Sequence, residues 1–377
     1  MATKTYCPIG NHPFFSVPVW RALMLMFAYG IHPAVSVAAD PGGPQPGAEE
    51  LEISVPYVTN RRPLDEGAGS TAYGGGRGTP SFGHCTVQFA PIPIINALAP
   101  QVPFYLPTER KTLRVERQDD AAAFWDGLTA AVAATATRSA VVFVHGYNYG
   151  FERSCKAAAA LQRSVRGQVA VFLFSWPSNA QAADYLVDQA DVEWSVPLLS
   201  DVLQELGDRV GSRQVQLLAH SLGTRGVMMA LDYLAAAHDR RPVIGPLVLI
   251  ASDVDAATFA DRLPTLASFT TGVTLYASSN DAPLKASRAL HGAPRLGEAG
   301  EFLTVAEGMQ TIDVSPLGRY QVFGHEYHLF HPRVAADLAT LLATGRDASH
   351  RPGLRAAQRD GLEYWLFDDT LQETAGD

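Results

Sequence analysis

The chain contains little cysteine and no concentrated positive charge. Its 377 residues include three cysteines, which lack the paired spacing of a zinc site and are too few for a disulfide framework. The formal charge is −9 at pH 7, and no run of lysine and arginine offers a surface for a phosphate backbone. We therefore expect no metal site and no nucleic-acid partner. Cys85 and Cys155 could pair in an oxidising compartment or remain separate thiols, and the sequence leaves both states open.

Apolar runs long enough to cross a bilayer are also scarce. One candidate is the uncharged stretch from Ala22 to Ala39, which follows Arg21 and ends in small residues that suit signal-peptidase cleavage. We predict that residues 1–39 are a signal peptide or, alternatively, an N-terminal membrane anchor. The protein is then exported, to the periplasm or the medium. The Pro- and Gly-rich segment 40–50 has the composition of a flexible linker.

Residues 51–118 are expected to form an N-terminal β extension. Leu51 to Val58 and Cys85 to Phe89 have the β-branched and aromatic content of strands. The sequence YGGGRG at 73–78 predicts a loop between them. This loop is not a phosphate-binding loop, because no Lys followed by Ser or Thr completes that motif.

From 119 to 377 apolar runs alternate with helical stretches, which predicts a mostly parallel central sheet flanked by helices. Asp119 or Asp120 can cap an Ala-rich helix that runs to Thr137. Six strands are expected, at Ala140–Val144, Val169–Phe174, Gln214–Ala219, Val243–Ile250, Gly272–Tyr276 and Gln310–Val314. Ligands of such folds bind beyond the carboxyl ends of the strands, so reactive residues are sought there.

Ser221 is the candidate nucleophile. It follows one of these strands and precedes a stretch of helical composition, which predicts a strand, a sharp turn and a helix. Such a turn exposes the serine hydroxyl above the sheet and needs small neighbours, which Ala219 and Gly223 provide. The pattern departs from GxSxG at its first position, where Ala adds one methyl group.

A serine hydroxyl needs a base to take its proton and an acid to orient that base. Asp281 follows the strand ending at Tyr276 and is the preferred acid, although it can also cap the helix that begins at Ala282. Asp253 and Asp255 follow an earlier strand and are alternative acids.

His325 is the preferred base. It lies in the loop beyond the last predicted strand, and the preceding Gly324 suits a tight loop that presents an imidazole. His328 and His331 are competitors. With Ser221 and Asp281 placed earlier, the order Ser, Asp, His is the order expected of this fold.

Acyl transfer also requires donors for a negatively charged oxygen. We expect these to be the backbone amides of Leu222, directly after the nucleophile, and Tyr147, after the strand ending at Val144. Further pocket candidates are His145, which more plausibly braces its loop than titrates, together with Asn148, Trp176 and His220. Trp176 can line the pocket or pack in the core.

These residues stand in motifs that resemble an α/β-hydrolase esterase family known as domain of unknown function nine hundred. The resemblance covers nearly everything after the leader and runs through ISVPYVTNRRP, FVHGYN, FSWPS, AHSLGTRGVMMA, IASDVDAATF, LYASSNDAPLKASRALHGAPRLG and FGHEYH. It implies an α/β-hydrolase fold and a hydrolase that uses Ser221, Asp281 and His325 without metal or cofactor. GHEY replaces the GHSY of the family, which changes the neighbour of the base.

The sequence thus predicts hydrolysis of a small-molecule or lipid-like carboxylic ester through an acyl-serine intermediate. A lipase, thioesterase or acyltransferase would use the same three residues, because the fold does not determine the acyl group. A non-catalytic exported binding protein of the same fold is the alternative from another class.

Overall fold

The computed structural model describes residues 51–64, 73–92, 109–237, 244–318 and 323–368. The chain divides into two units, Met1–Val35 and Ser36–Asp377, and all described residues lie in the second. The predicted leader and linker therefore lie outside the described residues. Among the helices of the described ranges, none is both long and apolar enough to cross a membrane.

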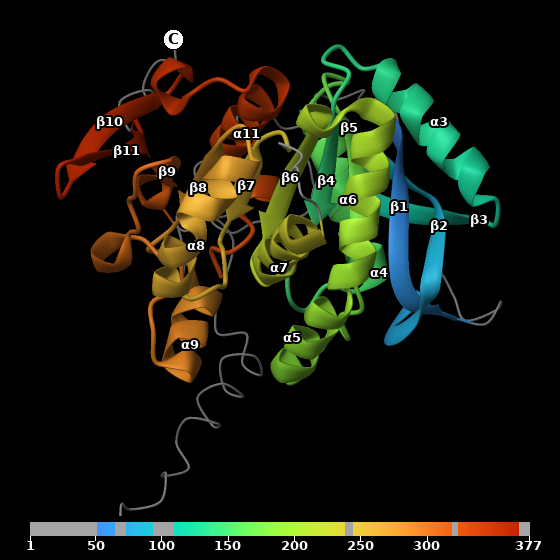
Figure 1. Ribbon diagram of the computed structural model, residues 1–377, viewed down its shortest axis with the longest axis horizontal. Helices are drawn as coiled ribbons and strands as arrows, with labels where there is room; N and C mark the ends of the chain where they lie inside the picture. Colours follow the sequence, from blue (N-terminus) through green and yellow to red (C-terminus); the bar gives the residue numbers. More distant parts are fainter. Residues whose placement is uncertain (1–50, 65–72, 93–108, 238–243, 319–322, 369–377) are drawn as a thin grey trace, which may run out of the picture. The chain divides into compact units, whose positions relative to one another are not determined.

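The described part of the chain is built around one sheet of eleven strands in the order β10-β11-β9-β8-β7-β6-β4-β5-β1-β2-β3 (Figure 1). The strands are β1 (Leu51–Pro63), β2 (Tyr73–Pro91), β3 (Glu109–Gln118), β4 (Ala140–Val144), β5 (Ala170–Ser175), β6 (Val215–His220), β7 (Leu247–Ile250), β8 (Val273–Ala277), β9 (Met309–Asp313), β10 (Leu354–Arg359) and β11 (Leu362–Phe367). Among the strands of the described residues, the antiparallel pairs are β1 with β2, β2 with β3 and β10 with β11. The sheet is otherwise parallel, which confirms the α/β-hydrolase fold with its N-terminal strands.

Helices cover both faces of the sheet. They are α3 (Ala121–Ala133), α4 (Phe151–Ser164), α5 (Tyr185–Trp194), α6 (Val196–Val210), α7 (Gly223–Ala237), α8 (Ala256–Phe269), α9 (Ala282–His291), α10 (Tyr327–Phe330) and α11 (Pro332–Thr344). Strand β4 shows why two layers form. Its Val142 and Val144 belong to the core cluster that includes residues of α3, α6, α7 and α8, whereas Val141 and Phe143 belong to the cluster that includes residues of α4 and α11. Figure 1 shows the helices on the two sides of the sheet. Alternating apolar side chains thus bury both faces.

The core strands lie close to their predicted positions. Strand β4 has the predicted bounds, and the other five begin or end within a few residues of them. The helix predicted to run to Thr137 ends at Ala133, and its cap is Asp120, whose carboxylate accepts the Ala123 N–H at 3.1 Å. Because helix ends depend on tertiary contacts, their bounds are the least predictable part of such a pattern.

The prediction of a loop at residues 73–78 is wrong. These residues begin strand β2, which pairs with β1 through register shifts near Arg61 and Pro63. The glycines permit a close approach of main chains here, since a Cβ at Gly75 would lie 2.6 Å from the Asn179 Cα. Glycine in this segment therefore marks backbone packing within a strand.

Strands β3, β10 and β11 were not predicted. The first is a charged edge strand, ERKTLRVERQ. Its polar composition lacks the apolar pattern from which strands are predicted. The other two follow the loop that carries His325, so that this loop comes after β9 but not after the last strand.

Cys85 and Cys155 are buried, and no disulfide joins them. Burial, and then the neighbouring Cys85 thiol, raise the pKa of Cys155 well above its usual value. Of the two states that the sequence left open, the structure contains the free thiols.

Candidate active site

Ser221 lies on the turn between β6 and α7. Its φ of +53° is in the left-handed region, which costs a non-glycine residue on the order of 1–3 kcal/mol. Its N–H donates to the Ile250 carbonyl at 2.9 Å and holds the turn. Glycines make room for it, because a Cβ at Gly146 would lie 2.7 Å from the Ser221 Cβ, and one at Gly223 would lie 2.5 Å from the His145 carbonyl oxygen. This is the arrangement of a nucleophile elbow.

The structure joins His325 to Asp281. The His325 Nδ1–H donates to the Asp281 Oδ2 at 2.7 Å, across 44 positions of sequence. Asp281 also caps helix α9, because its Oδ1 accepts the Leu284 N–H at 2.9 Å. The two functions considered for this carboxylate are therefore compatible. With Nδ1 donating to the acid, neutral His325 has Nε2 as its proton acceptor.

The pair is buried, with the Asp281 side chain fully enclosed and 15% of the His325 side chain exposed. Burial opposes a charged imidazole, but the charge and hydrogen bond of Asp281 outweigh burial and raise the pKa of His325 above its usual value. Burial also raises the pKa of Asp281, against the opposing effect of the bonds from His325 and Leu284. His325 is thus arranged as a base supported by an adjacent carboxylate.

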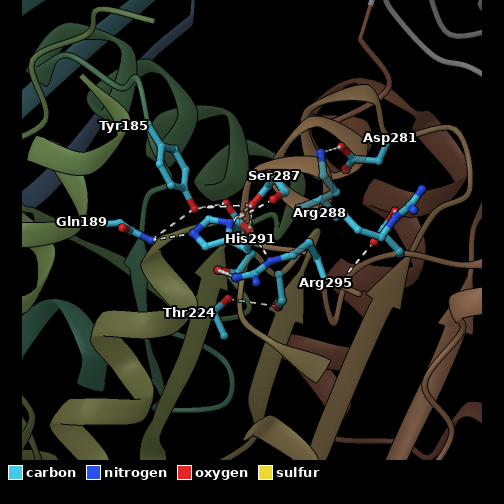
Figure 2. A network of polar contacts seen from close by, with 12 residues as sticks. Tyr185, Gln189, Thr224, Asp281, Ser287, Arg288, His291 and Arg295 are labelled. Carbon is cyan, nitrogen blue, oxygen red and sulfur yellow. Dashed lines mark hydrogen bonds and ion pairs between the residues drawn. The ribbon is translucent and has the colours of Figure 1, made fainter. Parts of the chain in front are cut away.

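Asp253, the first alternative acid, is engaged elsewhere. Its Oδ1 accepts the Arg295 Nε–H at 2.8 Å and the Ser287 hydroxyl at 2.6 Å, and its Oδ2 accepts the Tyr185 hydroxyl at 2.7 Å. Figure 2 shows Tyr185 reaching from α5 toward Ser287, with Arg295 below them. Within the described ranges Asp253 has no hydrogen bond to His325, so Asp281 is the carboxylate that the fold brings to this imidazole.

The other candidates for acid and base also have different partners. Asp255 caps α8 by accepting the Thr258 N–H at 2.8 Å. His331 caps α11 by accepting the Arg333 N–H at 3.3 Å. His328 is buried, and among the described residues neither of its ring nitrogens has a partner. Burial lowers the pKa of His328 to about 3, so this ring is neutral.

His220 lies between the candidate base and the candidate nucleophile. It precedes Ser221 directly, its ring centroid lies 4.7 Å from that of His325, and its Nε2–H donates to the His325 carbonyl at 3.3 Å. In the described part of the chain, Ser221 and His325 make no direct hydrogen bond; in unliganded enzymes this contact is often long and tightens when substrate binds. Although His328 adds a third ring, no group of His, Cys, Asp or Glu in the described ranges is arranged to hold a metal ion.

Tyr147 and Leu222 carry the two backbone amides that the sequence predicts as oxyanion donors. Among the described residues, neither the Tyr147 N–H nor the Leu222 N–H has a hydrogen-bond partner. Leu222 precedes the first turn of α7, where helix N–H groups favour negative charge. Tyr147 is fixed by its side chain, whose hydroxyl donates to the Ala182 carbonyl at 2.5 Å.

His145 and Trp176, two of the pocket candidates, are interior residues. Their rings stack at 4.8 Å, both are fully buried, and the Trp176 indole N–H donates to the His145 carbonyl at 2.8 Å. Arg61 donates to the His145 Nε2 at 3.2 Å, so the Nδ1–H donates to the Gly146 carbonyl at 2.9 Å. Burial, followed by the Arg61 charge, lowers the pKa of His145 well below its usual value. Asn148, another of the pocket candidates, is half-buried, and its φ of +59° lies in the left-handed region.

The model of a protein family described as "Alpha/beta hydrolase of unknown function (DUF900)" matches residues 120–344. The chain belongs to this family. Comparison with curated proteins gives no match. The description of the DUF900 family names a hydrolase without a substrate.

Solved structures with a related fold share little sequence with this DUF900 protein. The RedJ thioesterase from the prodiginine biosynthetic pathway of Streptomyces coelicolor is 13% identical, with 57% of this chain and 87% of that chain covered and a TM-score of 0.33. Carboxylesterase CesB (YbfK) from Bacillus subtilis is 11% identical, with 80% and 94% covered and a TM-score of 0.32. The carboxylesterase EstE1, cloned from a metagenomic library, is 12% identical, with 87% and 95% covered and a TM-score of 0.33. None of these similarities indicates an activity for this chain.

Glu326, the residue at which this DUF900 chain departs from the expected GHSY, is tied to the loop that follows β4. Its carboxylate accepts the Tyr149 hydroxyl and forms an ion pair with Arg153 at 2.9 Å. Burial opposes its charge, but Arg153 and the Tyr149 hydroxyl prevail and hold the pKa of Glu326 below its usual value. The loop of His325 is thereby attached to the loop of Tyr147.

Sequence reasoning also passed over Arg61 and Asp188. Both are fully buried, and both contact the loop of residues 145–149. No local pattern reveals them, because their partners in that loop lie 88 and 40 positions away in sequence.

Proposed function

We propose that the protein is a serine hydrolase that cleaves carboxylic esters through a covalent acyl intermediate on Ser221. The observation that carries the proposal is the His325–Asp281 hydrogen bond of 2.7 Å at the sheet edge where Ser221 occupies a strained turn. A buried acid that orients an imidazole toward a serine on a strained elbow is the arrangement that activates a hydroxyl at neutral pH.

In the proposed acylation step, the Ser221 Oγ attacks the ester carbonyl carbon while His325 Nε2 takes its proton. The carbonyl oxygen becomes negatively charged and accepts hydrogen bonds from the Tyr147 and Leu222 N–H groups. When the tetrahedral intermediate collapses, the bond to the alcohol oxygen breaks, and His325 returns the proton to the leaving alcohol. Asp281 stabilises the imidazolium that exists between these two transfers.

Deacylation reverses the same chemistry with water. His325 removes a proton from a water molecule, the resulting hydroxide attacks the acyl carbon, and the Ser221 oxygen leaves with that proton. The products are a carboxylic acid and the free enzyme. Every group in both steps belongs to the chain itself or to the substrates.

The substrate proposed is a small-molecule or lipid-like ester. The acyl chain length is the property that separates an esterase from a lipase, and transfer to an acceptor other than water separates both from an acyltransferase. Hydrolysis of p-nitrophenyl esters of graded length separates esterase from lipase, a matching thioester detects a thioesterase, and an added alcohol acceptor detects acyl transfer.

The test compares the wild-type chain with Ser221→Ala and with Ser349→Ala, which changes an exposed serine far along the chain. We expect Ser349→Ala to retain wild-type kcat and Ser221→Ala to lose at least ~10³-fold, because removal of a nucleophile abolishes the covalent route. A folded wild-type protein without turnover of any ester would support the non-catalytic binding protein, and full activity of Ser221→Ala would refute the proposed nucleophile.

A further inference from the structure

Arg61 is a fully buried arginine that lies outside the part of the chain matched by the family model. It belongs to β1, which pairs in parallel with β5 and so brings the N-terminal strands against the core. Burial of a guanidinium is costly unless its donors are satisfied. The hydrogen-bond partners of Arg61 therefore indicate its role.

All five N–H donors of the Arg61 guanidinium have partners. Nε donates to the Ser175 Oγ at 2.9 Å, and Nη1 donates to the carbonyls of Ser178 at 2.9 Å and Gly74 at 3.3 Å. Nη2 donates to the Tyr149 carbonyl at 2.7 Å and to the ring of His145 at 3.2 Å. Arg61 thus donates hydrogen bonds to both ends of the segment 145–149. This segment contains the Tyr147 N–H, which has no partner among the described residues.

Asp188 of α5 contacts the same segment by accepting hydrogen bonds. It is fully buried, and its Oδ2 accepts the Asn148 N–H at 3.1 Å and the Ser178 hydroxyl at 2.5 Å. The Ser178 oxygen in turn accepts the Tyr149 N–H at 3.0 Å. Asn148 is the residue of this loop with a left-handed φ, a conformation that persists only where its surroundings impose it.

The two charges support each other. Burial lowers the pKa of Arg61 to about 9, and the charge of Asp188 is the largest effect opposing this decrease. Arg61 therefore stays charged at neutral pH. Loss of either residue leaves the other charge buried and frees one side of the loop.

We propose that Arg61 and Asp188 are positioning residues that fix the backbone of residues 145–149 so that the Tyr147 N–H remains beside Ser221 as an oxyanion donor. The inference rests on the proposed hydrolase function and assigns a part of the site to the N-terminal strands. The loop is close enough to matter, because a Cβ on Gly146 would lie 2.7 Å from the Ser221 Cβ. A small displacement of a donor reduces its stabilisation of the transition state and leaves substrate binding intact.

The test uses Arg61→Met and Asp188→Asn, which remove the charges and retain most of the volume. Arg62→Met changes the adjacent exposed arginine, and Arg351→Met removes a buried arginine paired with an aspartate at 2.9 Å elsewhere in the fold. We expect both loop variants to lose ~10²-fold in kcat with KM changed less than ~3-fold, as for a misplaced oxyanion donor.

The controls separate positioning from stability. Arg351→Met should lower the melting temperature and retain kcat, whereas Arg62→Met should change neither. Arg61→Lys should remain slow, because an ammonium cannot replace the five-donor fork. Combining Arg61→Met with Asp188→Asn should cost much less than the product of the single losses, since both act through one loop.

A second readout does not depend on turnover. Hydrogen exchange followed by mass spectrometry should show faster exchange of the peptide containing residues 145–149 in both loop variants. Unchanged exchange there, or a kcat equal to wild type in a folded Asp188→Asn, would overturn the positioning role. Failure of Ser221→Ala to reduce activity would instead refute the proposed function and leave the exchange result to decide the role of the loop contacts.

Discussion

Replacing Asp281 by Asn should disable turnover and spare the fold. The asparagine has one carbonyl oxygen, where Asp281 uses one oxygen for the Leu284 N–H and the other for His325. If the carbonyl oxygen keeps the helix cap, the amide NH2 faces His325 Nδ1, and a donor in that place requires Nδ1 to be the acceptor. Nε2 then carries the proton and cannot accept one from Ser221.

The expected loss is ~10³–10⁴-fold in kcat, the range known for a triad whose base is held in the wrong tautomer. At about 1.4 kcal/mol per factor of ten, this corresponds to ~4–5.5 kcal/mol of transition-state stabilisation. The melting temperature should change little, because an asparagine caps a helix about as well as an aspartate.

Asp253→Asn provides the matched comparison. This change weakens a buried ion pair with Arg295, in which both side chains are almost completely enclosed, and loss of such a pair costs ~3–5 kcal/mol of folding stability. We expect a lower melting temperature and a much smaller loss of kcat than in Asp281→Asn. The assay is steady-state hydrolysis of p-nitrophenyl acetate alongside scanning calorimetry. The reverse ranking, with Asp253→Asn the slower enzyme, would refute the assignment of the acid.

The remaining predictions concern pH, two glycines and the leader. Activity should fall as the pH drops through the raised pKa of His325, because the base must be neutral; a pH–rate profile without an acid limb would contradict this. Gly146→Ala should abolish turnover, because its Cβ would meet Ser221, and Gly127→Ala in α3, where a Cβ meets nothing within 4 Å, should stabilise the fold by ~0.5–1 kcal/mol in chemical denaturation. We propose that the protein is exported; N-terminal sequencing of the mature chain should begin near residue 40, and a cytoplasmic protein with an intact N-terminus would contradict export.

The core of the fold and the positions of the proposed reactive groups were predictable because their signals are local. Strand β4 is a continuous apolar run, and Ser221 follows a strand with small neighbours on each side. Asp281 and His325 were found because parallel strands end at one edge of the sheet, so residues that follow different strands meet there. The sequence favoured Asp281 but left Asp253 open, because both follow strands; their different partners in the structure distinguish the two carboxylates.

Other features depend on contacts that a sequence pattern does not encode. Strand β2 contains glycines that resemble loop residues but allow close packing against Asn179. The charged strand β3 lacks the apolar alternation of a buried strand. Arg61 is adjacent to the exposed Arg62 and has the same charge, and only the fold shows that one is buried with five partners.

Covalent labelling tests the central claim most directly. A fluorophosphonate should add one phosphonyl group to the wild-type chain, and peptide mass spectrometry should place it on Ser221. Ser221→Ala should remain unlabelled, and Asp281→Asn should react far more slowly at neutral pH, because its base is held in the wrong tautomer. A folded wild-type protein that takes up no probe, or that carries the adduct on another residue, would contradict the account.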